Sequence, residues 1–102
     1  MALSDPYGFD AELWEWGGKA SWCFASLPEA VTDDIDGRFG HLAAGFGSFK
    51  VEVAIGATTW RTSVFPDAKR GTLILPVKKD VRRREGVDFG DTVSIVLRVV
   101  LD

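Results

Sequence analysis

The chain has 102 residues and a mass of 11.2 kDa, and its residues are 46% hydrophobic, 12% aromatic and 26% charged. These proportions are typical of one soluble globular domain, and they exclude a disordered or fibrous chain. A chain of this length has no room for a multi-domain enzyme with a separate cofactor domain. The formal net charge of −3 also lowers the expectation of a general nucleic-acid binder.

Cys23 is the one cysteine of the sequence, which excludes an internal disulfide or a thiolate pair for metal or redox chemistry. We therefore expect a reducing, cytoplasmic location and neither a metal nor another cofactor. Residues 1–10 have neither the basic start nor the apolar stretch of a secretory signal peptide. The most apolar run, residues 93–101, is far shorter than the roughly 20 residues that a membrane span needs.

Charge is unevenly distributed along the chain. Residues 1–36 hold eight acids and one base, whereas residues 67–84 hold seven bases and two acids. We interpret the basic segment, residues 69–84, as mainly solvated surface. Contact of this segment with an anion or a nucleic acid is the alternative.

The first third of the chain predicts a β-hairpin after an N-terminal tail, residues 1–8. Apolar and polar residues alternate over residues 9–14, and strand alternation over residues 20–26 places Trp22 and Phe24 on one face, opposite Cys23. The glycine pair 17–18 between the two runs is typical of a hairpin turn. Cys23 is then an inert strand residue.

A short acidic helix should follow this hairpin. Residues 26–29 match a capping box with a proline suited to the first helical turn. Val31 and Ile35 are four residues apart and are expected to face the core. The Gly-rich loop after the helix contains His41, which we interpret as a surface residue because no catalytic partner is recognisable nearby.

The middle of the chain predicts a second hairpin. Residues 49–55 alternate between apolar and polar side chains, residues 56–57 form the turn, and residues 58–65 form the return strand. Pro66 is expected to end that strand because proline has no backbone donor.

The last third predicts a short strand over residues 72–75, a helix over 77–85 and a final strand over 93–101. Gly86 fits the left-handed residue that follows a helix. The final strand is apolar on both faces and is therefore expected to be central. About six strands arranged as hairpins, with two short helices, favour a mainly β fold, a small barrel that is closed or partly closed.

Two resemblances add to this interpretation. The first is carried by Leu75-Pro76-Val77-Lys78, Val81-Arg82, Gly86 and Gly90-Asp91-Thr92-Val93. These residues resemble the GD box of double-split β-barrel proteins, which include the AbrB-like transition-state regulators. In such a bend Gly90 permits the tight turn and Asp91 accepts hydrogen bonds from backbone donors.

The second resemblance covers residues 9–101. It is carried by residues 9–14, Trp22, 27–29, 45–47, 58–66, 75–78, 81–82 and 90–91. Over this span the chain is similar to the bacterial family called domain of unknown function 1905 (DUF1905). The resemblance implies a double-split β-barrel, and it implies no catalytic residues, since no activity is established for the family.

The second hairpin and the segment after Pro76 supply a candidate binding site. Its residues are Trp60, Arg61, Thr62, Ser63, Lys78 and Arg82. Lys78 and Arg82 are one helical turn apart, so we expect these side chains to converge around a small anionic or polar ligand, with Trp60 as a stacking wall. In the alternative interpretation, Arg61 pairs with an acid such as Glu12 or Glu52 and Trp60 fills the barrel.

A second candidate surface is the pair Trp14 and Trp16, which point to one face of the first strand. Exposed together, the two indoles suit stacking on a sugar, a base or a peptide. Core filling or a dimer seam is the alternative interpretation.

No sequence motif indicates catalysis, whether a Gly-x-Ser-x-Gly turn, His-rich metal spacing or a Gly-rich phosphate loop. We predict a non-enzymatic module, monomeric or homodimeric, that binds a small ligand or a protein. The alternative is a nucleic-acid-binding regulator of the AbrB-like type, with Lys78, Lys79 and residues 82–84 on phosphates.

Overall fold

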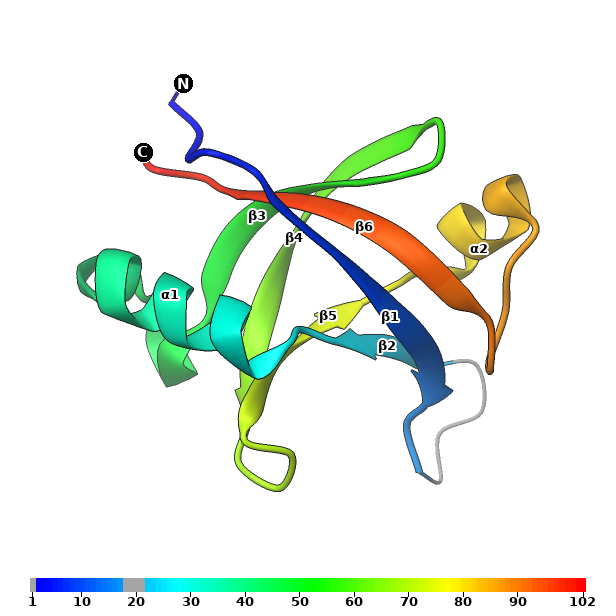
Figure 1. Ribbon diagram of the computed structural model, residues 1–102, viewed down its shortest axis with the longest axis horizontal. Coiled ribbons are helices and arrows are strands. Elements are labelled where there is room, and N and C mark those ends of the chain that lie inside the picture. The colour runs from blue at the N-terminus through cyan, green and yellow to red at the C-terminus, as the bar shows by residue number, and fades with distance from the viewer. Residues whose placement is uncertain (1, 18–21) are drawn as a thin grey trace.

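The computed structural model describes residues 2–17 and 22–102, in which six strands close into one barrel (Figure 1). The strands are β1 (Tyr7–Glu15), β2 (Cys23–Ser26), β3 (Phe49–Ile55), β4 (Thr58–Asp67), β5 (Thr72–Pro76) and β6 (Thr92–Val99). Their order around the barrel is β1-β2-β5-β4-β3-β6, and every neighbouring pair is antiparallel. With the helices α1 (Glu29–Phe39) and α2 (Lys79–Glu85), this confirms the predicted mainly β barrel.

The two longest strands, β1 and β4, each belong to both halves of the barrel wall. The first part of β1 pairs with β6 and its end pairs with β2. In the same way, β4 pairs with β3 as far as Val64 and with β5 from Phe65 onward. One half of the wall is therefore β1-β6-β3-β4, and the other is β1-β2-β5-β4.

Side chains from alternate strand positions fill the barrel interior. In β3 and β6 the buried residues are Phe49, Val51, Val53, Ile55, Val93, Ile95, Leu97 and Val99. The short strands β2 and β5 differ, because they are buried on both faces. Ala25 and Leu75 belong to the core cluster, whereas Phe24 and Ile74 are buried outside it.

Two segments after β5 match their predictions closely. Gly86 has a φ of 67° and ends α2, with Gly86 N–H donating to the Arg83 carbonyl and Val87 N–H donating to the Arg82 carbonyl. At the bend before β6, the Asp91 carboxylate accepts a hydrogen bond from the Asp88 N–H at 2.8 Å, as expected for the GD box.

The predicted capping box does not form. Helix α1 has Pro28 as its N-cap and no capping hydrogen bond from a side chain. Ser26 is the last residue of β2, and its Oγ instead accepts a hydrogen bond from Trp14 Nε1 at 3.0 Å. Ser26 therefore belongs to the barrel wall and does not cap the helix, although the local sequence pattern predicts a cap.

Strand ends also differ from the predictions. Pro66 does not end β4 but pairs opposite Leu73, in a part of β4 where the pairing with β3 has already ended. A proline is tolerated there because one side of the strand needs no donor. Strand β6 lies between β1 and β3 as expected for a central strand, yet its outer face is exposed, including Val96, because no layer covers it.

The segment predicted as a tail, residues 1–8, contributes to the barrel. Strand β1 already begins at Tyr7, and Leu3 forms a bridge with Val100. The Oγ of the buried Ser4 accepts a hydrogen bond from the Val99 N–H at 2.8 Å. The predicted turn at 17–18 and the start of the strand predicted over 20–26 lie partly outside the described residues.

Gly56 and Gly37 offer a matched pair for testing the fold. Gly56 has a φ of 56°, and a Cβ there would overlap the Glu85 carboxylate, which accepts a hydrogen bond from Thr58 Oγ1 at 2.6 Å. Gly37 lies within α1 with open space around it. We expect Gly56→Ala to lower the free energy of unfolding by about 1–2 kcal/mol. Gly37→Ala should raise it by about 0.5–1 kcal/mol.

Urea denaturation of both variants measures these changes. A shift of both variants in the same direction would contradict the assigned backbone conformations.

Candidate functional site

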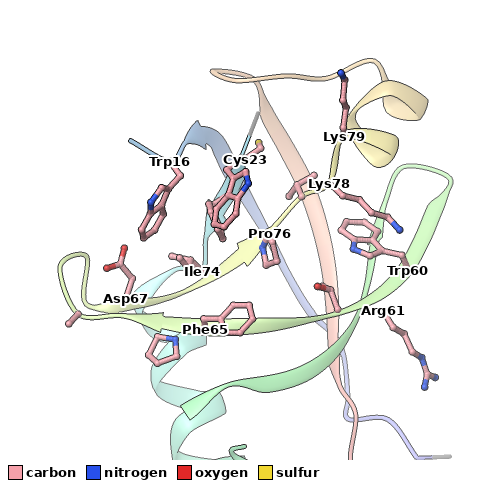
Figure 2. A pocket seen from close by; sticks show the side chains of 16 residues that line it. Trp16, Cys23, Trp60, Arg61, Phe65, Asp67, Ile74, Pro76, Lys78 and Lys79 are labelled. Carbon is pink, nitrogen blue, oxygen red and sulfur yellow. The ribbon is translucent and has the colours of Figure 1, made fainter. Parts of the chain in front are cut away.

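An elongated open pocket of about 740 Å³, hereafter the aromatic groove, lies on the outer face of β2, β5 and β4. Most of its lining is apolar, and five aromatic side chains belong to it: Trp16, Trp22, Phe24, Trp60 and Phe65. Figure 2 shows Trp16 and Trp60 at opposite ends, with Phe65, Ile74 and Pro76 between them. The exposed fractions of Trp22 and Phe65, 56% and 41%, are high for such large apolar side chains.

The wall at the Trp16 end is a stack of three rings. Trp16 and Trp14 both lie against Phe24, with 5.3 Å between ring centroids in each case. The guanidinium of Arg70 lies 3.5 Å from the centre of the Trp14 ring, and Trp14 is also held by its hydrogen bond to Ser26. Trp14 and Trp16 are thus half-buried, with Trp16 lining the groove and Trp14 supporting it.

The opposite end of the groove is basic. Lys78, Lys79 and Arg61 contribute to the lining there, and Figure 2 places the Lys78 side chain beside Trp60. Arg61 also forms an ion pair with Glu52 at 3.2 Å, so this part of the alternative interpretation is confirmed. Trp60 packs against the core as well as lining the groove, which combines the two interpretations of that residue.

The one carboxylate among the described lining residues, Asp67, lies at the Trp16 end (Figure 2). Asp67 accepts hydrogen bonds from Arg70 Nη1 at 2.8 Å and from the Lys69 N–H at 3.1 Å. The hydrogen bond from Arg70 holds the pKa of Asp67 below its usual value, so this group is ionised and already engaged at neutral pH.

Hydrogen-bond donors dominate the polar groups that the groove offers to a ligand. An indole carries one N–H donor and no acceptor, and a lysine ammonium carries donors only. Five side chains of this kind line the groove: Trp16, Trp22, Trp60, Lys78 and Lys79. Within residues 2–17 and 22–102 these side chains make no hydrogen bond. The groove is therefore suited to a ligand that is rich in acceptors.

Not all candidate residues converge. Trp60, Arg61, Thr62 and Lys78 line the groove, but Ser63 and Arg82 do not. Arg82 is only 6% exposed and donates to the Val77 carbonyl at 3.2 Å and to Asp88 Oδ1 at 3.0 Å. Lys78 and Arg82 do not share a helical face as expected, because α2 begins at Lys79 and Lys78 is its non-helical N-cap.

Several lining residues were missed by the sequence analysis, including Phe24, Phe65 and Asp67. One usable signal was present, because strand alternation already placed Trp22 and Phe24 on one face, opposite Cys23. Cys23 lies at the edge of the groove, and burial raises the pKa of its thiol to about 11, so the thiol is protonated at neutral pH.

A second cavity of about 420 Å³ lies between the N-terminal segment and α1. Tyr7 donates to Asp34 Oδ2 there at 2.6 Å, and Arg38 pairs with the same carboxylate at 3.0 Å. Burial, followed by this hydrogen bond to Asp34, raises the pKa of Tyr7 to about 12. Tyr7, Asp34 and Arg38 thus satisfy one another in this cavity.

Comparison with family models identifies the family of this chain. The model described as Domain of unknown function (DUF1905) matches residues 9–97. The chain belongs to this family. A comparison with curated proteins finds no match. Membership in DUF1905 confirms the resemblance seen in the sequence, and the family description assigns no activity. Among the helices that the structure describes, none has the length and apolar character needed to cross a membrane.

The buried Arg82 should act on stability and not on binding. We expect Arg82→Ala to lower the free energy of unfolding by about 1–3 kcal/mol, because the buried Val77 carbonyl loses its donor. Arg84→Ala, at an exposed position of the same helix, is the control and should change little. Urea denaturation measures both variants. An Arg82→Ala protein of unchanged stability would contradict this structural role.

Proposed function

We propose that this DUF1905 domain is a non-catalytic binding module whose ligand lies in the aromatic groove. The ligand has an apolar body, several hydrogen-bond acceptors and a negative charge placed at the basic end. The observation that carries the proposal is the combination in one groove of five aromatic rings with polar groups that are mainly donors.

The exposed aromatic surface supports this proposal energetically. Soluble proteins rarely leave large apolar side chains clustered on the surface unless the cluster contacts a partner or a ligand. Trp22 and Phe65 are both exposed, and they line the same groove as the buried Phe24 and Ile74. A ligand that covers these rings removes apolar area from water, which stabilises the complex by roughly 25 cal/mol per Å² before the costs of association.

The basic end gives the ligand its charge preference. Lys78 and Lys79 contribute two positive charges to the lining, whereas Asp67 is engaged by Arg70 and lies at the other end. An anionic group beside the two lysines is therefore favoured over a cation.

A nucleic-acid-binding regulator is less well supported. In that function Arg82 would contact a phosphate, but Arg82 is buried and forms an ion pair with Asp88. Arg83 lies 4.0 Å from Asp80, a carboxylate that competes with phosphate for the same guanidinium. A nucleic acid is therefore the appropriate competing ligand for a binding experiment.

The probe for the proposed function is 8-anilinonaphthalene-1-sulfonate, an aromatic anion. We expect this probe to bind, and we expect Trp60→Ala to weaken binding by roughly tenfold, equivalent to about 1.4 kcal/mol from the lost stacking. Phe46→Ala is the matched control because Phe46 is a fully exposed aromatic residue that does not line the groove.

Titration calorimetry measures both affinities, and circular dichroism verifies that both variants are folded. Equal affinity of the two variants, or no binding by the unmodified domain, would contradict the proposed function.

A further inference from the structure

The lining of the aromatic groove narrows the class of ligand. We infer that the groove binds a proline-rich peptide segment in the polyproline II conformation, with an acidic residue beside Lys78 and Lys79. This inference rests on the function proposed above and specifies its ligand.

Hydrogen bonding is the first argument. A polyproline II segment has no internal hydrogen bonds, so its carbonyl groups remain available as acceptors. Its prolines also lack the N–H donor of other residues, and the segment therefore presents acceptors almost exclusively. The indole N–H groups of Trp16, Trp22 and Trp60 provide the complementary donors.

The shape of the lining is the second argument. Proline-rich segments characteristically bind in aromatic-lined grooves, where their rings pack against flat aromatic faces. In this groove the rings of Trp16 and Trp60 stand at opposite ends, and Phe65 and Pro76 lie between them (Figure 2).

The length of the groove agrees with a short peptide. From Trp60 at one end to Phe65 between the two ends, five positions along β4 correspond to roughly 16 Å of extended strand, which is part of the length of the groove. About five residues of polyproline II, at about 3.1 Å per residue, cover the same distance.

Charge distinguishes this ligand from a nucleic acid. A peptide with one acidic end needs positive charge at one end of the groove, where Lys78 and Lys79 lie. A single-stranded nucleic acid carries a negative charge on every nucleotide, whereas Lys78 and Lys79 provide positive charge at one end of the groove, on a domain whose net charge is −3. The observations therefore favour the acidic proline-rich peptide.

The test uses four ligands and the intact domain. The first peptide has about five prolines with glutamate at both ends, which makes the result independent of the direction of binding. The second replaces both glutamates by lysines, and the third replaces the prolines by glycine and serine. The fourth ligand is an oligothymidylate. Titration calorimetry gives each affinity, beside that of 8-anilinonaphthalene-1-sulfonate.

We expect the glutamate-flanked proline peptide to bind at least about tenfold more tightly than each of the other three ligands. Trp60→Ala should weaken that binding by about tenfold, and Phe46→Ala should leave it unchanged. The double variant Lys78→Glu/Lys79→Glu should reverse the preference, so that the lysine-flanked peptide binds more tightly than the glutamate-flanked one.

Four results would overturn the inference. Equal binding of the glycine–serine peptide would remove the requirement for polyproline II. Preferential binding of oligothymidylate, weakened by added salt, would assign the groove to nucleic acid. Binding of 8-anilinonaphthalene-1-sulfonate without binding of the proline peptide would reject the peptide while retaining the proposed function. If none of the ligands binds, both the peptide inference and the proposed function are rejected.

Discussion

The site depends on a short piece of sheet, β2 paired with β5, that is apolar on both faces. Ala25 and Leu75 are fully buried in the barrel core, while Phe24 and Ile74 are buried on the other side. A sheet with two apolar faces needs a second covering layer in addition to the core. Here Trp14 and Trp16 cover part of the outer face, and the uncovered part is the floor of the aromatic groove.

This covering layer also explains why neighbouring polar residues are engaged in structural contacts. Arg70 stacks on Trp14 and pairs with Asp67, so the acidic group at this end of the groove is satisfied. At the other end, Lys78 and Lys79 form no ion pair among the described residues; both line the groove, and Lys78 lies beside Trp60. The resulting asymmetry of charge gives the groove a defined basic end.

Local patterns in the sequence predict the elements but not the groove. Alternation over residues 49–65 predicts the hairpin of β3 and β4, and Gly86 predicts the end of α2, because both signals act between near neighbours. The groove requires β2 to pair with β5 about fifty residues away, as in the contact between Ala25 and Leu75. Arg82 was misassigned for a related reason, since its burial depends on how α2 packs and not on charge spacing.

The most direct test of the central claim, that ligands bind across Trp16 and Trp60, is a nuclear magnetic resonance titration of the indole N–H signals. The chain has four tryptophans, and the N–H of Trp14 already donates to Ser26. During titration with 8-anilinonaphthalene-1-sulfonate, the Trp16 and Trp60 signals should shift most and reach saturation, and the Trp14 signal should shift least. Four unchanged signals, or a largest shift at Trp14, would contradict the account.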